Sequence, residues 1–178
     1  MSCLLTSGIT KGCRDNSGGL KRVLLANKEN ITSVLPAIGG TADQGIITGI
    51  TGATAQVFYE FVPNKMSSNW VENIQSNPQN GTIGYEQVVT LMFAKNEASK
   101  RNQIKLMGQA EMVAIVEDYN NKYFYLGEVN GLEVNGGNSS SGTALTDMNG
   151  WTITLQGMEH EPAREVETSI VDALIVNS

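Results

Sequence analysis

The chain has 178 residues, and its 12 Lys and Arg against 18 Asp and Glu give a formal net charge of −6. That length suits a single domain, which buries about 70% of its unfolded surface without a disulfide or metal. The 40% hydrophobic content argues against disorder, and the acidic balance argues against a basic surface for nucleic acid. One histidine and two cysteines leave little for histidine catalysis or transition-metal binding, so we predict no enzyme and no cofactor.

The start of the chain and its cysteines bear on where the protein is made. Met1–Gly8 lacks the basic start and apolar run of a signal peptide, and no stretch approaches the ~18 apolar residues of a membrane span. We therefore expect a soluble protein made in a cytoplasm, with no membrane anchor. Cys3 and Cys13 do not have a zinc-binding spacing, and we expect them to be reduced thiols.

Short apolar runs bounded by turn residues predict strands through the first half of the chain. In chain order these strands are 20–26, 31–35, 46–50, 55–62, 70–76 and 83–94. Ala55–Val62 has apolar residues on both faces, which predicts a central or covered strand. In Ile83–Ala94, one face is apolar except at Gln87, and its members are Tyr85, Val89, Leu91 and Phe93.

A helix and more strands are predicted in the second half. Asn96–Gly108 is the one predicted helix, with Asn96 as its N-cap and Gly108 as its C-terminal stop. Met112–Val116 and Lys122–Leu126 then form a predicted hairpin. The segment 130–150 is rich in Gly, Ser and Asn, which predicts a long mobile loop.

Trp151–Gln156 alternates strictly, which predicts a strand with Ile153 and Leu155 facing inward. For the segment 163–178, a strand and an irregular tail both remain open. Together the elements predict an all-β, mainly antiparallel sandwich or small barrel of about eight strands with one flanking α-helix, in one domain spanning 1–178.

Charge is unevenly distributed along the sequence. Residues 1–105 hold ten Lys and Arg and seven Asp and Glu, whereas residues 106–178 hold two and eleven. One interpretation is a solvated acidic flank. The other is that copies of the chain meet with the basic part of one against the acidic part of the next.

The few candidates for chemistry have simpler explanations. Glu159–Glu161 places one imidazole between two carboxylates, but neighbours in an extended chain point to opposite faces. Glu60 and Glu86 would form a glycosidase pair only if two different strands brought them into one cleft. Exposed strand edges, in contrast, need covering, and a ring of identical copies covers each edge with the next copy.

Several segments resemble, in the same order, a family of tailed-bacteriophage structural proteins of the tail-tube type. The segments that carry this resemblance are Met1–Asn27, NGTIGYEQVVTL at Asn80–Leu91, GEVNGL at Gly127–Leu132, SGTALTDMNGW at Ser141–Trp151, and Glu161–Ala163. They extend over nearly the whole chain. None of them marks an active site.

The resemblance implies a β-sandwich or small barrel with one flanking helix, whose copies form hexameric rings. The inner sheets of a ring join into the wall of a lumen, and rings stack through long loops and terminal arms. The implied function is that of a non-enzymatic virion protein that builds the tail tube, or the barrel of a short tail, and so forms the channel for DNA ejection. A neutral or acidic lumen wall would not hold the phosphates of passing DNA.

The resemblance also implies partners and a location. The partners are other copies of the chain, further tail or connector proteins, and DNA in transient, non-specific passage. The protein would be made in the cytoplasm of a host bacterium and reside in the virion tail.

We expect contacts between copies from the N-terminal arm 1–19 and from 130–150. The predicted contact residues are Cys3, Ile9, Lys11, Arg14, Leu132, Val134, Leu145 and Met148. The predicted residues of the lumen sheet are Glu86, Gln87 and Thr90. The alternative hypothesis is a phage receptor- or carbohydrate-binding module, or a capsid decoration protein, that binds through Tyr119, Tyr123 and Tyr125.

Overall fold

The computed structural model describes residues 7–39 and 45–176, and antiparallel strands dominate its regular structure. Its elements are β1 (Leu20–Asn27), a 3-10 turn (Lys28–Asn30), β2 (Ile31–Leu35), β3 (Ile46–Ile47), β4 (Gly49–Gly52), β5 (Tyr59–Phe61), β6 (Asn69–Asn77), β7 (Thr82–Ala94), α1 (Ala98–Met107), β8 (Met112–Asp118), β9 (Tyr123–Leu126), β10 (Glu133–Ser140), β11 (Gly150–Glu159), β12 (Arg164–Val166) and α2 (Thr168–Leu174). The expected all-β, mainly antiparallel character is confirmed, but the described chain has two α-helices where one was predicted.

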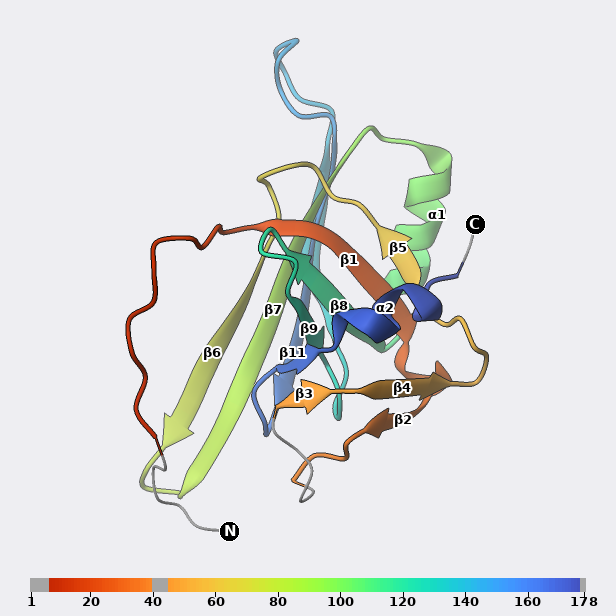
Figure 1. The fold of residues 1–178 in the computed structure, drawn as a ribbon. Coiled ribbons are helices and arrows are strands. Elements are labelled where there is room, and N and C mark those ends of the chain that lie inside the picture. Colours follow the sequence, from red (N-terminus) through yellow and green to blue (C-terminus); the bar gives the residue numbers. More distant parts are fainter. Residues whose placement is uncertain (1–6, 40–44, 177–178) are drawn as a thin grey trace.

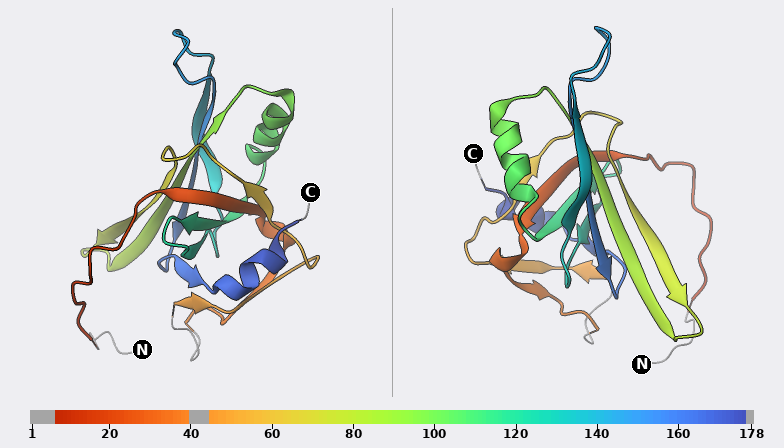
Figure 2. Two further views of the ribbon diagram at one scale, coloured as in Figure 1. Left: turned by 45° about the horizontal axis from the view of Figure 1, so that its top comes forward. Right: turned by 180° about the vertical axis from the view of Figure 1, so that it is seen from behind.

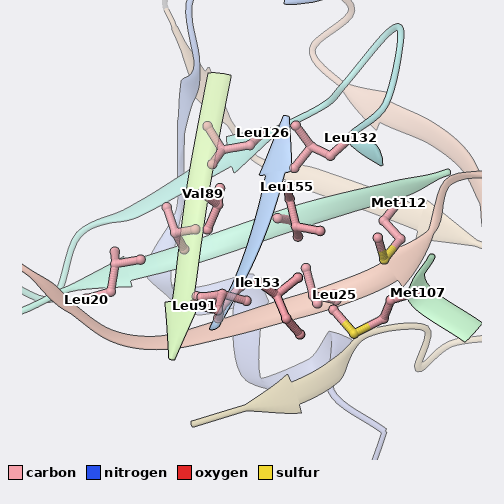
Figure 3. Close-up of a cluster of buried hydrophobic side chains, with 13 residues drawn as sticks. Leu20, Leu25, Val89, Leu91, Met107, Met112, Leu126, Leu132, Ile153 and Leu155 are labelled. Carbon is pink, nitrogen blue, oxygen red and sulfur yellow. The ribbon is translucent and has the colours of Figure 1, made fainter. Parts of the chain in front are cut away.

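Two sheets face each other across the main core. One has six strands in the order β3-β12-β9-β8-β1-β5, and the other has four in the order β10-β11-β7-β6. Side chains of β1 and β8 meet those of β7 and β11 between the sheets, as Figure 3 shows for Leu25, Leu91 and Ile153. Each fully buried Leu or Ile contributes about 1.5–3 kcal/mol, so this interdigitation holds the two sheets together.

A second core lies on the other side of the six-stranded sheet. There α2 and the small sheet formed by β2 and β4 pack against Tyr125, Ile115 and Leu24. Figure 1 and the left view of Figure 2 show α2 and these two strands on the side of β1 and β8 away from β7. The six-stranded sheet is therefore covered on both faces and forms the middle layer.

A charged network anchors the third layer to the sheet. The guanidinium of Arg22 donates to Glu117 and Tyr123, and it pairs with Glu60 at 3.0 Å and with Asp172 of α2 at 3.3 Å. Glu117 is 2% exposed and also accepts from Lys21 at 2.6 Å. A buried carboxylate is tolerated only when cations pair with it. The charge of Glu117 therefore needs both Lys21 and Arg22.

The predicted helix is confirmed as α1, with a corrected start. Glu97 occupies the N-cap position and makes no side-chain capping bond. The prediction of Asn96 as the cap is wrong, because its side chain donates instead to Ser140 O at 3.2 Å and to Asn149 Oδ1 at 2.7 Å. Gly108 follows the last helical residue, as predicted. Ile104 and Met107 pack against the main core.

The prediction for Ala55–Val62 is wrong in two respects. Regular strand structure covers only β5, and β5 is an edge of the six-stranded sheet rather than a central strand. Phe58 is buried while Tyr59 is exposed. The reason lies at the other end of the chain: the N–H groups of Val57 and Phe58 both donate to Leu174 O, which turns Phe58 into the second core.

Three further predictions are corrected. The run 46–50 forms two strands in different sheets, because Thr48 turns aside to donate its N–H to Leu35 O at 2.8 Å. The segment after Pro162 is neither one strand nor a tail, since it forms β12 and then α2. The supposed loop 130–150 contains strand β10, which pairs with β11 over most of its length and leaves only 141–149 as a hairpin tip.

The two described helices are not candidates for membrane spans. Neither α1 nor α2, the helices of residues 7–39 and 45–176, combines the length and apolar character needed to cross a bilayer.

Candidate functional site: the open face and edges of the four-stranded sheet

The four-stranded sheet is covered on one face only. Val89 and Leu91 of β7 and Ile153 and Leu155 of β11 are buried against the six-stranded sheet. The residues between them point the opposite way, because side chains alternate along a strand. We call that second side the open face. In the right view of Figure 2 no described helix or strand lies over it.

The open face is polar and almost uncharged. Register places these side chains on it: Asn69, Val71, Asn73, Gln75 and Asn77 from β6; Thr82, Glu86, Val88, Thr90, Met92 and Ala94 from β7; Thr152, Thr154, Gln156 and Met158 from β11; and Glu133, Asn138 and Ser140 from β10. Its charges are the carboxylates of Glu86 and Glu133, and no Lys or Arg stands at any of these positions. A wall of this kind offers no cation to a phosphate.

A row of amide and carboxylate groups crosses the open face through all four strands. Asn135 of β10 donates to Gln156 of β11, which donates to Glu86 of β7 at 2.5 Å. From β6, Asn73 and Gln75 donate to the same carboxylate at 3.1 Å and 3.5 Å. The row ties the strands together and surrounds the charge of Glu86 with amide donors.

Both edges of this sheet are unpaired. Within the described chain β6 pairs with β7 and β10 pairs with β11, and each has no strand on its other side. Neither strand carries Lys or Pro, two residues that commonly block an edge against pairing. A bulge between Val134 and Gly136 disturbs only the start of β10. Apart from Ser140 O, which accepts from Asn96, the outward-pointing backbone groups of these nine- and eight-residue strands therefore have no strand to pair with in the described chain.

The direction of the edge strands follows from the strand order. Each neighbouring pair in β10-β11-β7-β6 is antiparallel. With four strands, the first and the last then run in opposite directions. If a second copy in the same orientation places its β10 beside β6 of the first, the new pair is antiparallel as well.

The predicted lumen residues divide between the two faces. Glu86 and Thr90 lie on the open face. Gln87 does not, because it is 2% exposed on the covered face, where it donates to Glu72 at 3.1 Å and accepts from the N–H of Gly127 at 2.9 Å. Consecutive residues of one strand cannot line the same surface, and we withdraw Gln87 from that set.

The predicted contact residues are also only partly available. Ile9, Lys11 and Arg14 are exposed on the arm, which is held at its base by hydrogen bonds of 2.8 Å between Ser17 and Asn120. Cys3 lies outside the described residues. Cys13 is exposed and unbonded.

On the second predicted contact segment, Leu145 is fully exposed at the hairpin tip and Met148 is half-buried. Val134 is half-buried opposite Leu155 on the covered face. Leu132 is wrongly predicted, because it is 0% exposed in the main core.

The other candidates are not brought together. Glu60 pairs with Arg22 on the far face of the six-stranded sheet, whereas Glu86 lies on the open face, so the main core separates these carboxylates. Glu159 is buried and accepts the N–H groups of Val129 and Asn130, while His160 is exposed. No cluster of three or more metal-ligating side chains occurs in residues 7–39 and 45–176.

The tyrosines of the alternative hypothesis are mostly inaccessible. Tyr123 and Tyr125 are 6% and 1% exposed in the second core. Burial raises the pKa of Tyr125 above its usual range, and the hydroxyl group has no hydrogen-bond partner in the described chain. A ligand approaching the surface would not reach either ring.

Sequence reasoning expected exposed strand edges but did not identify β6 and β10 as the strands that form them, and it missed the amide row. The outward positions of Thr152, Thr154 and Gln156 follow from the alternation of β11, but the matching residues of β10 were hidden in a Gly- and Asn-rich segment. Comparisons of the chain with family models, with curated proteins and with solved structures give no significant match.

Proposed function

We propose that this protein is a tail-tube-type structural component of a tailed-bacteriophage virion. Copies join edge to edge into a ring, and rings stack into a tube, or into the barrel of a short tail, through which DNA passes. The observation that carries the proposal is the four-stranded sheet with an open, cation-free face and two unpaired edges of opposite direction.

Ring closure is favoured by the strand count. When copies are related by rotation about one axis, all point the same way along that axis, and β6 of each copy meets β10 of the next as an antiparallel pair. Pairing around the full circle leaves no free edge, which solves the aggregation hazard of an open sheet. In this arrangement we take the open face to line the inside of the ring, so the main core and α2 lie outside it.

The size of such a ring suits a nucleic-acid channel. Six copies, the number that the resemblance implies, give a wall about 37 Å across between opposite backbones, because neighbouring strands lie about 4.8 Å apart and tilt widens the barrel further. Barrels of about 16–18 strands already leave an aqueous channel. An inner wall of polar and apolar side chains with two carboxylates and no Lys or Arg would let DNA slide without being held.

The decisive experiment blocks one edge without unfolding the protein. Along an edge strand, successive N–H groups alternate between the partner strand and the outside. Of the two variants Asn138→Pro and Ser139→Pro, one therefore loses a bond to β11 and the other loses only an outward donor. Urea unfolding identifies the variant that keeps wild-type stability.

We expect that stable variant to remain monomeric where the wild type forms rings. Light scattering after size-exclusion chromatography at rising concentration gives the mass, and negative-stain images give the shape. Rings of wild-type size from the stable variant, or a wild type that stays monomeric at every concentration, would overturn the proposal.

A further inference from the structure

Four asparagines of the chain are followed directly by glycine: Asn80, Asn130, Asn135 and Asn149. In such a pair the backbone nitrogen of the glycine can attack the side-chain amide carbon of the asparagine, because glycine has no side chain to hinder the approach. The attack requires an asparagine amide that is free to turn toward this nitrogen, and a backbone that can adjust. The folded structure therefore determines which of the four pairs can react.

Two of these asparagines are held by their own amide groups. Asn130 donates from its side chain to Met158 O at 2.7 Å, and its backbone N–H donates to the buried carboxylate of Glu159 at 2.8 Å. Asn135 lies at the bulge of β10, where its amide donates to Gln156 of β11. For either amide to turn toward the glycine that follows it, a hydrogen bond must first break.

Asn149 is held by its side chain and by the packing of the glycine that follows. Its Oδ1 accepts from the amide of Asn96 at 2.7 Å. Gly150 is buried and pairs with Ala94 of β7. A Cβ atom placed on Gly150 would lie only 2.1 Å from Phe93 O, so this backbone has no space in which to rearrange.

Asn80 differs from the other three in each of these respects. It is exposed in the turn between β6 and β7, at the far end of the hairpin that these strands form (Figure 1). Among residues 7–39 and 45–176, neither the side chain of Asn80 nor the N–H of Gly81 takes part in a hydrogen bond. Apart from its chain neighbours, no described atom lies within 4 Å of where a Cβ of Gly81 would stand.

The hydrogen bonds of this turn all lie before the reacting groups. Asn77 Oδ1 accepts the N–H groups of Gln79 and Asn80 at 3.1 and 3.2 Å. These bonds fix the backbone that leads into Asn80, but they leave its amide and the nitrogen of Gly81 free. The nucleophile and the carbon that it attacks are thus both unrestrained and open to water.

We propose that Asn80–Gly81 is a site of spontaneous covalent modification, at which asparagine converts to aspartate and isoaspartate through a succinimide. The nitrogen of Gly81 loses its proton to a base in the solvent and bonds to Cγ of Asn80, while the Cγ–Nδ2 bond breaks and ammonia leaves. Water then opens the ring. Attack at Cγ gives aspartate, whereas attack at the backbone carbonyl carbon gives isoaspartate, and in sum one water is consumed for each ammonia released.

Either product changes the charge of the hairpin end. Residues 73–85 contain no Lys, Arg, Asp or Glu. The reaction therefore places the first charge, a carboxylate, in a turn that is uncharged when the chain is made. The isoaspartate form also routes the backbone through the side-chain carbon and lengthens the turn. This modification concerns the single chain and does not depend on the proposed ring.

Folded and unfolded protein incubated side by side test the proposal. The full chain is kept at low concentration and mildly alkaline pH, in buffer and in guanidinium chloride, and peptide maps by mass spectrometry give the conversion at each of the four pairs. In the folded protein we expect Asn80 to convert at least about tenfold faster than each of the other three, which corresponds to about 1.4 kcal/mol in activation free energy. In the unfolded chain this preference should disappear, because all four amides are then free.

Asn80→Gln is the matched variant, because it keeps an amide in the turn but would need a larger ring to react. It should stay unmodified at this position and keep the wild-type free energy of unfolding. Gly81 is left unchanged, since its φ of +66° would strain any other residue. The conversion of Asn80 should also accelerate with pH, because the attacking nitrogen must lose its proton.

Three outcomes would overturn the proposal. One is that Asn80 of the folded protein converts no faster than the other three asparagines. Another is an equal preference for Asn80 in the folded and the unfolded chain, which would mean that the fold does not cause it. The third is aspartate at position 80 without isoaspartate, which would indicate direct hydrolysis of the amide instead of a succinimide.

Discussion

The six-stranded sheet is packed on both faces, by the four-stranded sheet on one side and by α2 with β2 and β4 on the other, whereas the four-stranded sheet is packed on one. The difference extends to their charged groups. In the six-stranded sheet Glu117 is buried with two cations, while in the four-stranded sheet Glu86 is half-buried among amides. The four-stranded sheet therefore has one face and two edges that are available for contacts outside the described chain.

The largest expected loss of stability comes from a substitution in the six-stranded sheet, which is covered on both faces. Glu117→Ala leaves Arg22 without its most buried partner, and removal of one member of a buried pair costs about 3–5 kcal/mol. Urea unfolding should show that loss in the free energy of unfolding. A loss below about 1 kcal/mol would mean that Arg22 is already satisfied by solvent and by Glu60.

Substitutions at two neighbouring residues of β7 allow a direct comparison of the two faces of the four-stranded sheet. Leu91→Ala removes a fully buried side chain from the main core and should cost about 2–5 kcal/mol. Thr90→Ala, on the open face, should change the free energy of unfolding by no more than about 0.5 kcal/mol. Equal losses for the two variants would show that the open face is covered in the folded monomer.

The amide row across the open face should have a smaller effect. Glu86→Ala removes the acceptor shared by Gln156, Asn73 and Gln75, all of which can turn to water, so we expect a loss of about 1 kcal/mol. Glu133→Ala, on the same face without a hydrogen bond among the described residues, serves as control and should be neutral. The comparison is made by urea unfolding of the monomer at low concentration.

The smallest effect is local to the hairpin tip. The N–H groups of Thr143 and Ala144 donate to the carboxylate of Asp147 at 2.8 and 2.7 Å, and these bonds hold the pKa of Asp147 below its ordinary value of 3.8. A lowered pKa in the folded state means that the contribution is present above 3.8 and is lost as pH falls through the lowered value. The amide resonances of Thr143 and Ala144 should therefore shift in acid, and in Asp147→Asn they should show no such titration.

Patterns within single segments were readable from the sequence. The alternation in 83–94 and 151–156 correctly placed Leu91 and Leu155 inside, because one face of each strand packs on the main core. Strand β10 was missed because VNGGNSS has little intrinsic strand preference and pairs only because β11 lies beside it. Helix α2 was missed because its seven residues are too few to show a helical repeat: only two of them, Val171 and Leu174, are buried.

The candidate site divides in the same manner. The sequence places Thr90 and Glu86 on one side of a strand, and the side that faces outward follows once Leu91 is buried. The sequence does not show which residues of distant strands lie opposite each other. The amide row from Asn135 to Gln75 depends on that register. Free edges are likewise a property of the assembled strand order, which no local pattern encodes.

The position of the last described residues has a practical consequence. Val176 donates its N–H to Phe58 O at 2.8 Å, next to α2 and on the side of the six-stranded sheet remote from the four-stranded one. In the proposed tube that position faces the surrounding solvent. A fluorescent or affinity label attached there would decorate the circumference without obstructing the bore, and each copy would display one.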